Sequence, residues 1–212
     1  MSGIFITIEG PDGAGKTSVI NELYPRLQLI AQKGIIKTRE PGGVRISEKI
    51  RSIILDPSHT EMDERTEALL YAAARRQHLV EVILPALNAG KIVICDRFVD
   101  SSLAYQGAGR RIGMKDIAEI NEFATEGTTP DFTLYLDVDS DTGLRRIQQN
   151  RTNQVDRLDS EGLEFHQRVR HAYLKLAEEH PLRIHRVDAR MSLQDVVEAS
   201  YSAIVEAYPQ YF

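Results

Sequence analysis

The stretch that decides the fold, residues 4–17, reads IFITIEGPDGAGKT. Its first five residues, 4–8, are apolar or β-branched and are typical of a buried strand. Residues 10–17 fit the pattern G-x-x-x-x-G-K-[ST], and from Thr17 onward apolar residues recur at helical spacing as far as Lys33-Gly34. The stretch therefore predicts a strand, a glycine-rich loop and a helix, which is the context that a phosphate-binding loop requires.

This loop contains the residue types that bind a triphosphate. Glycines let successive backbone N–H groups point at phosphate oxygens, and the N-terminus of the next helix adds a favourable dipole. Lys16 would reach the outer phosphates and Thr17 would hold Mg²⁺. We therefore predict that ATP binds to eight loop residues: Gly10, Pro11, Asp12, Gly13, Ala14, Gly15, Lys16 and Thr17. The alternative is a glycine turn that binds no nucleotide.

A GTPase is disfavoured. The sequence has no NKxD-type guanine motif, and its DxxG match at 159–162 lies in a polar stretch rather than at the end of an apolar strand.

The rest of the chain alternates short apolar runs with helical patterns. Four more strands are predicted, at 35–39, 91–95, 132–136 and 184–187. Helices are predicted at about 17–33, 44–55, 63–89 with a bend at Pro85, 114–126, 140–150, 161–180 and 193–208. This alternation indicates an α/β fold with a doubly wound, five-stranded parallel sheet flanked by helices, in one domain over residues 1–212. In such sheets ligands bind at the carboxyl ends of the strands, where GPDGAGKT, REPGG and DRF should converge.

Composition excludes several classes of protein. The formal net charge of −5 argues against a nucleic-acid-binding protein, which needs a cationic face. No apolar run approaches the ~20 residues needed to cross a bilayer, and the N-terminus lacks a signal peptide, so a cytoplasmic enzyme is expected. Cys95 closes an apolar run and is expected to be buried. The six histidines show no metal-ligand spacing.

Three motifs together resemble those of the bacterial thymidylate kinases, a P-loop nucleoside monophosphate kinase family. They are residues 10–17, REPGG at 39–43 and DRFVDSSLAYQ at 96–106. The third is the most specific, because its DR-x-x-DS-x-x-AYQ pattern separates thymidylate kinases from other nucleoside monophosphate kinases. The resemblance covers nearly the whole chain. It implies Mg²⁺-dependent phosphorylation of dTMP to dTDP by ATP, in dTTP synthesis, and a homodimer, for which the helices at 44–55 and 63–89 offer apolar faces.

The resemblance also implies which side chains bind dTMP. Asp12 matches a carboxylate that faces the deoxyribose 3′-hydroxyl and the acceptor phosphate. Arg39, Arg97 and Arg51 match arginines that hold this phosphate, for which a guanidinium fork is well suited. For Arg51 the alternative is a solvated helix face.

A second set of residues is expected around the base. Tyr71 and Arg75 are four apart and share a helix face, so an aromatic ring and a guanidinium can meet one flat ligand. In the family the equivalent aromatic, usually Phe, stacks on thymine and the arginine binds its O4. Ser102 and Gln106 match positions that read the polar edge of thymine, and Tyr105 matches the aromatic that disfavours ribose. For Tyr71 the alternative is a side chain packed in the core. For Ser102, Tyr105 and Gln106 the alternative is a polar helix start.

Two further assignments concern charge around the moving phosphoryl group. Asp96 ends the third strand and is a candidate, with Thr17, for holding Mg²⁺, because this ion prefers hard oxygen ligands. The polar segment at about 150–160 resembles the family's LID, which supplies charge on closing. We therefore expect Arg151 or Arg157 to act with Lys16, Arg97 and Asp96 in catalysis, the alternative being a solvated loop.

Two rival functions remain open at the level of sequence. The first is a P-loop kinase for another nucleotide or nucleoside, which would not call for Tyr105, Gln106 and the Tyr71/Arg75 face. The second is a regulatory module that binds ATP without turnover. The arginines expected on the acceptor side count against it.

Overall fold

The computed structural model describes residues 3–150 and 157–212. Its core is a five-stranded, all-parallel sheet in the order β2-β3-β1-β4-β5. The strands are β1 (Ile4–Glu9), β2 (Ile35–Arg39), β3 (Ile92–Asp96), β4 (Phe132–Asp137) and β5 (Ile184–Asp188). Each lies within one residue of its predicted position at either end. The predicted doubly wound α/β fold is therefore confirmed.

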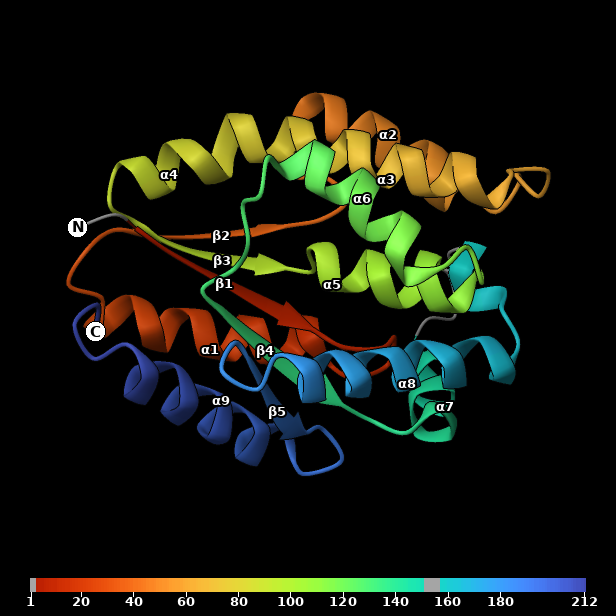
Figure 1. The fold of residues 1–212 in the computed structure, drawn as a ribbon. Coiled ribbons are helices and arrows are strands. Elements are labelled where there is room, and N and C mark those ends of the chain that lie inside the picture. Colours follow the sequence, from red (N-terminus) through yellow and green to blue (C-terminus); the bar gives the residue numbers. More distant parts are fainter. Residues whose placement is uncertain (1–2, 151–156) are drawn as a thin grey trace.

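Helices cover both faces of this sheet (Figure 1). They are α1 (Lys16–Ile30), α2 (Arg45–Leu55), α3 (Glu64–His78), η1 (Leu79–Ile83), α4 (Leu84–Asn88), α5 (Val99–Ser102), η2 (Leu103–Gly109), α6 (Met114–Thr125), α7 (Ser140–Asn150), η3 (Arg157–Ser160), α8 (Leu163–Glu179) and α9 (Leu193–Ala207). Within the described residues, no helix is both long and apolar enough to traverse a bilayer.

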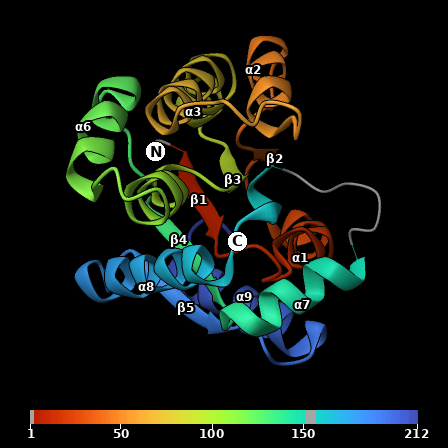
Figure 2. The same cartoon turned by 90° about the vertical axis from the view of Figure 1, so that its right-hand side faces the viewer.

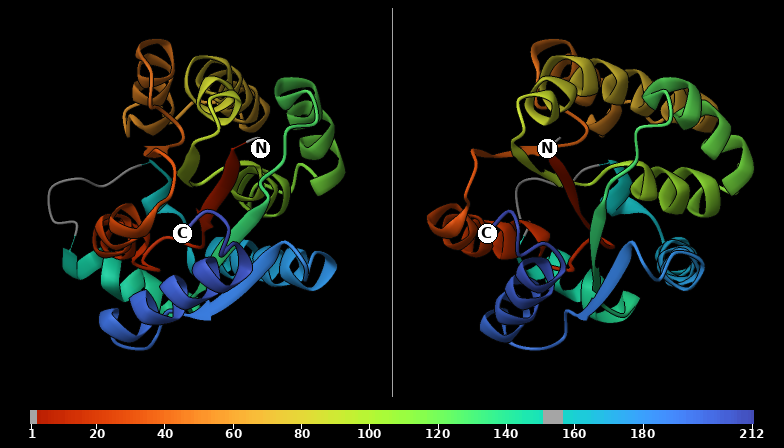
Figure 3. Two further views of the ribbon diagram at one scale, coloured as in Figure 1. Left: turned by 90° about the vertical axis from the view of Figure 1, so that its left-hand side faces the viewer. Right: turned by 60° about the vertical axis from the view of Figure 1, so that its left-hand side comes forward.

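The central strand β1 explains the two layers, because its side chains alternate between faces. Ile4, Ile6 and Ile8 pack with residues of α1 and α9, which lie side by side on one face (Figure 3). Phe5 points to the other face, where it packs with residues of η1, α4 and β3. Cys95 is fully buried in this second cluster, as predicted, and burial raises the pKa of its thiol. Both faces of the strand are thus buried, in keeping with its continuous apolar sequence.

Two helical segments differ from the sequence prediction. The helix expected at 63–89 is interrupted at 79–83 by a π-helical turn, just before Pro85 near the start of α4. Proline has no N–H to continue the regular ladder, so a locally widened turn at this point is physically reasonable. Residues 99–109, for which no helix was predicted, form the short helix α5 followed by a second π-helical segment, η2. This segment carries Ser102, Tyr105 and Gln106.

The carboxyl ends of the strands all point toward one end of the molecule (Figure 2). The loops after β1, β2 and β3 meet there, and they carry the three motifs that the sequence analysis singled out.

Candidate active site

A cleft of about 690 Å³ lies at this end of the sheet. Its walls come from the loop after β1, the segment after β2, helices α2, α3 and α7, the α5–η2 segment and residues near Ala189. Apart from Gly10 and Pro11, every described residue assigned to ATP, dTMP or Mg²⁺ from the sequence lines this cleft. These residues are Asp12, Gly13, Ala14, Gly15, Lys16, Thr17, Arg39, Arg51, Tyr71, Arg75, Asp96, Arg97, Ser102, Tyr105 and Gln106.

The loop at 10–17 wraps tightly around the start of α1. Gly13 has φ 76°, and a Cβ there would lie 2.2 Å from the carbonyl oxygen of Gly143 on α7. A side chain at this position would therefore both strain the backbone and collide with a neighbouring helix. Lys16 Nζ donates to the carbonyls of Gly10 and Pro11, at 2.9 Å each. The lysine thus holds the loop curved around the space above α1.

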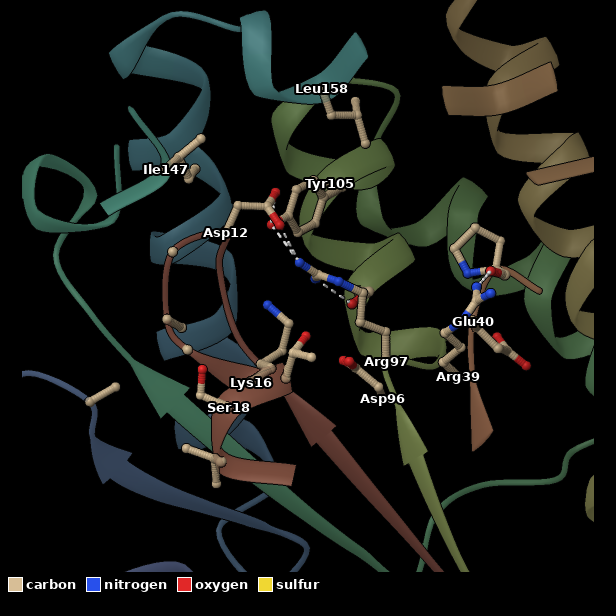
Figure 4. A pocket seen from close by; sticks show the side chains of 18 of the residues that line it. Asp12, Lys16, Ser18, Arg39, Glu40, Asp96, Arg97, Tyr105, Ile147 and Leu158 are labelled. Carbon is tan, nitrogen blue, oxygen red and sulfur yellow. Dashed lines mark hydrogen bonds and ion pairs between the residues drawn. The ribbon is translucent and has the colours of Figure 1, made fainter. Parts of the chain in front are cut away.

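Lys16 is itself buried, and its environment works against its charge. Burial, followed by the nearby charge of Arg97, lowers the pKa of Lys16 to about 8. Two cations therefore lie close together at the bottom of the cleft, where Figure 4 shows both side chains pointing into the same space. The carboxylates of Asp12 and Asp96 offset part of this repulsion, but the pKa of Lys16 is still lowered, so a further anion between the cations would be stabilised.

Arg97 connects this loop with the opposite wall. Its Nη2 forms an ion pair with Asp12 Oδ1 at 2.6 Å, and its Nη1 donates to Gly10 O at 3.1 Å. Tyr105 donates its hydroxyl to Asp12 Oδ2 at 2.7 Å, and the guanidinium carbon lies 4.9 Å from the centre of the Tyr105 ring. Asp12, Arg97 and Tyr105 therefore form one connected polar cluster (Figure 4).

The backbone of Arg97 is in an unusual conformation, with φ 69°. A non-glycine residue in the left-handed region is uncommon and needs support from its surroundings. The Arg97 N–H donates to Ile8 O at 3.0 Å, and the next N–H, of Phe98, donates to Glu9 Oε1 at 2.7 Å. These bonds secure the turn that directs the guanidinium back toward the loop after β1.

The carboxylate of Glu9 accepts hydrogen bonds from residues that hold Arg97 in place. Its Oε2 accepts from Ser101 Oγ at 2.6 Å and from Tyr173 OH at 2.9 Å. Ser101 Oγ also accepts from Arg97 Nη1 at 3.0 Å. Burial, followed by the negative charge of Asp100, raises the pKa of Glu9 from 4.5 to about 7. Glu9 was not assigned a role from the sequence, because it reads simply as the polar end of a strand.

The titration of Glu9 gives a testable dependence of stability on pH. Because the folded-state pKa lies above the unfolded one, Glu9 contributes stability that is fully present below pH 4.5 and is lost as the pH rises through about 7. The contribution should fall by a few kcal/mol, on the order of 2 to 3, between about pH 5 and about pH 8. The charged and polar groups that face the Glu9 carboxyl are Arg97, Tyr173 and the Asp100–Arg183 ion pair, in which the closest N···O distance is 2.6 Å.

The measurement is urea unfolding across this pH range for wild type and Glu9→Gln. The free energy of unfolding of wild type, relative to Glu9→Gln, should fall by the stated amount as the pH rises. Glu178→Gln, at an exposed position on α8, is the control and should run parallel to wild type. Parallel curves for Glu9→Gln as well would contradict the raised pKa.

Arg39 and Arg51 lie on the wall opposite the loop. Arg39 Nη1 donates to Pro41 O at 3.1 Å, and Arg51 Nη1 donates to the same oxygen at 2.9 Å. Arg39 also pairs with Glu48 at 2.9 Å, and its side chain is 45% exposed. The two guanidinium groups thus meet at one carbonyl on the rim of the cleft, where they remain accessible to an anion.

Arg75 occupies a very different environment from the other arginines. It is 2% exposed and pairs through Nε with Glu40 Oε2 at 2.7 Å. It also donates through Nη1 to Ser102 Oγ at 3.1 Å and to Asn121 Oδ1, and through Nη2 to Phe98 O at 3.0 Å. These bonds use four of the five N–H groups of a guanidinium, so the group is held rigidly and can offer one further donor on Nη2.

Asp96 is the carboxylate best suited to a cation. Its Oδ1 is buried and has no hydrogen-bond partner within the part of the chain that the structure describes. The side chain faces the bottom of the cleft near Lys16 (Figure 4), and Thr17 lines the same space. An unpartnered carboxylate oxygen and a hydroxyl fit Mg²⁺, which keeps several of its own waters and needs few protein ligands. Among residues 3–150 and 157–212 no group of three His, Cys, Asp or Glu side chains forms another metal site.

The comparisons with known proteins agree with this geometry. A family model described as thymidylate kinase matches residues 8–199. Over 212 residues the chain is 74% identical to the thymidylate kinase of Enterococcus faecalis, covering all of both chains. It is 62% identical over 207 residues to that of Latilactobacillus sakei, covering 98% of this chain and 97% of the relative. The crystal structure of thymidylate kinase from Ehrlichia chaffeensis superposes with a TM-score of 0.78 at 32% identity, covering 96% of this chain and 99% of the other.

The chain belongs to the thymidylate kinase family. The resemblance read from the three motifs is therefore confirmed.

The LID arginines stand apart from the rest of the predicted site. Arg151 lies outside the described residues. Arg157 does not line the cleft: its Nε donates to Ile54 O at 3.1 Å, and its Nη2 pairs with Glu67 on α3. Its neighbour Leu158 does line the cleft. The transition-state role expected for Arg157 would require this side chain to leave Glu67.

Besides Glu9, Arg146 and Glu67 also hold site residues in place and were given no role from the sequence. Arg146, on α7, donates to Gly13 O at 3.3 Å and to Ala189 O at 3.0 Å, so it braces the phosphate-binding loop from the side. Glu67, one turn before Tyr71 on α3, accepts from Gln106 Nε2 at 2.8 Å. Neither contact has a signal in the sequence, because each joins segments about 40 or more residues apart.

Proposed function

We propose that this protein transfers the γ-phosphoryl group of ATP to dTMP. The observation that carries the proposal is the pair of cations, Lys16 and Arg97, held together at the bottom of one cleft. Lys16 belongs to a loop built for a triphosphate, and Arg97 lines the same cleft as Arg39 and Arg51. Two anions approaching from these two sides would meet where the cations converge, which is the arrangement that phosphoryl transfer needs.

The residues on the donor side bind and orient ATP. The backbone N–H groups of residues 10–17 and the N-terminus of α1 face the phosphates, and Lys16 moves its ammonium from the loop carbonyls to the outer phosphates. Thr17 and Asp96 would hold Mg²⁺, which when bound would neutralise charge on the phosphate oxygens.

The residues on the acceptor side align the attacking oxygen. Arg39, Arg51 and Arg97 hold the phosphate of dTMP, and Asp12 fixes the direction of the Arg97 guanidinium through their ion pair. A phosphate monoester has a second pKa near ~6 and is mostly dianionic at neutral pH, so its oxygen can attack without a general base. Alignment and charge compensation are therefore what the protein contributes.

The base lies between α3 and the α5–η2 segment. Tyr71 offers its ring for stacking, and Arg75 offers its remaining Nη2 hydrogen to the O4 oxygen of thymine. Ser102 and Gln106 face the polar edge of the base, and Tyr105, fixed by Asp12, closes the 2′ side of the sugar.

The test measures ADP formation with the monophosphates of thymidine, uridine, cytidine, adenosine and guanosine as acceptors, each with and without Mg²⁺. We expect dTMP to be the best acceptor and activity to require the ion. A faster reaction with another monophosphate would favour the rival kinase. ATP binding without ADP formation from any acceptor would favour a regulatory module.

A homodimer is part of the same proposal. Ile46 and Ile53 are two turns apart on α2, and with Leu69 and Val80 on the adjoining α3–η1 segment they remain between 37% and 55% exposed. Large apolar side chains exposed along two packed helices are suited to a second copy of the same surface.

We expect wild-type protein to sediment at twice the mass of one chain, and Ile53→Asp to sediment as a monomer. Leu29→Asp, on α1, is the matched control, because Leu29 is 87% exposed and α1 lies on the other face of the sheet. A wild-type protein that is monomeric at micromolar concentration would contradict the proposal.

A further inference from the structure

We propose that Glu67 makes the site select thymine over cytosine, by fixing the direction of the Gln106 side-chain amide. The proposal rests on the role in base recognition given to Gln106 above, and it adds a positioning residue to that role.

Glu67 is a buried carboxylate inside a polar cluster. It is 0% exposed, and its Oε1 accepts from Gln106 Nε2 at 2.8 Å and from Arg110 Nε at 3.4 Å. Its Oε2 accepts from Arg110 Nη2 at 3.2 Å and from Arg157 Nη2. Arg110 also pairs with Glu161. Both carboxylate oxygens of Glu67 therefore accept hydrogen bonds from guanidinium groups.

A carboxylate whose two oxygens both accept hydrogen bonds presents only acceptors to Gln106, and this decides how the amide is oriented. The Gln106 amide has one end that donates and one that accepts, and only the donating end can face Glu67. The accepting oxygen, Oε1, is thereby left as the end of the amide available to a ligand. Gln106 lines the cleft while being only 1% exposed, so it has little freedom to turn over.

An accepting oxygen at this place discriminates between pyrimidines. Thymine and uracil carry a hydrogen on N3, which can donate to Gln106 Oε1. Cytosine has a lone pair on N3 instead, so two acceptors would face each other and each would lose its bond to water. A site with a fixed hydrogen-bonding group rejects a base that lacks the matching group far better than an apolar pocket does.

The experiment measures kcat/KM for dTMP, dCMP and dUMP in wild type, Glu67→Gln and Glu67→Asp. In Glu67→Gln the new side chain can both donate and accept, so the Gln106 amide can face either way. In Glu67→Asp the shorter carboxylate no longer reaches Gln106 but still compensates the charges of Arg110 and Arg157. Each variant should lower the ratio of dTMP to dCMP about tenfold or more, while Arg75 retains part of the preference. The ratio of dTMP to dUMP should stay unchanged, because both bases carry the N3 hydrogen. A loss of structure alone would not separate these two ratios.

Two further variants complete the design. Arg65→Gln, at an exposed position on the same helix, should change neither ratio. Gln106→Met should lower the ratio of dTMP to dCMP as the Glu67 variants do. If Gln106→Met changes this ratio and both Glu67 variants leave it at the wild-type value, the positioning role of Glu67 is wrong while the role of Gln106 stands. If all three leave it unchanged, Gln106 does not read the base. A wild type inactive with dTMP would refute the proposed function itself.

Discussion

Replacing Arg97 by alanine should lower turnover by about 10³-fold, while ATP affinity changes only slightly, because an arginine that compensates transferred charge is worth about this much. Arg97 contacts Asp12 and Gly10 O within the site, and it lines the cleft together with Arg39 and Arg51. Removing it takes away a cation from the moving phosphoryl group and from the dTMP phosphate. The loss should therefore appear in kcat and in the KM for dTMP.

The measurement combines steady-state kinetics with calorimetric binding of ATP. Arg97→Lys is the matched variant, since lysine keeps the charge but lacks the planar fork that reaches Asp12 and a phosphate at once, and it should recover only part of the lost turnover. Equal losses in ATP affinity and turnover for Arg97→Ala would assign Arg97 to the donor instead. A melting temperature close to that of wild type is needed for either conclusion.

Replacing Lys16 by alanine should produce the opposite division of effects. Lys16 is the buried cation of the phosphate-binding loop, and it also ties together the carbonyls of Gly10 and Pro11. Turnover should fall by about 10²- to 10³-fold, as expected when one preorganised charge is removed from a transition state. ATP affinity should fall as well, and the affinity for dTMP in the absence of ATP should stay close to the wild-type value.

Calorimetric titration of each nucleotide separately checks this expectation. Ser18→Ala is a suitable control, because Ser18 lines the same cleft beside Thr17 and carries no charge. An ATP affinity in Lys16→Ala equal to that of wild type would show that the lysine does not contact the donor. Together the Lys16 and Arg97 variants test whether the cleft has separate donor and acceptor sides.

The sequence predicted the scaffold well because the responsible signals are local. Apolar runs such as 4–8 and 132–136 are too short for helices and are bounded by polar or glycine residues, so they become strands. The loop at 10–17 is restricted by residues adjacent in the chain, above all by its glycines. The carboxyl ends of parallel strands must share one edge of the sheet, which is why the three motifs could be expected to meet.

The segment at 99–109 was harder to predict. Its residues VDSSLAYQGAG have no clear apolar periodicity and include glycines, which disfavour a helix. Packing of α8 and α6 against this segment supports its helical form in the folded protein. The π-helical turn at 79–83 could not be predicted either, because Pro85 indicates that the helix is broken but not which kind of turn forms.

The amino-acid sequence alone thus determined the strand, loop and helix at the N-terminus, the parallel sheet and the residue types around the cleft. Periodicity and short-range spacing encode these features. Only the tertiary structure decided which atoms face the ligand. It placed four of the N–H groups of Arg75 on protein partners and paired Arg157 with Glu67. It also left Asp96 Oδ1 without a partner among the residues that the structure describes, and it directed Gln106 Nε2 toward Glu67. Burial removes these groups from water, so their partners are chosen by whatever distant segments the fold brings into contact, and no local pattern records that choice.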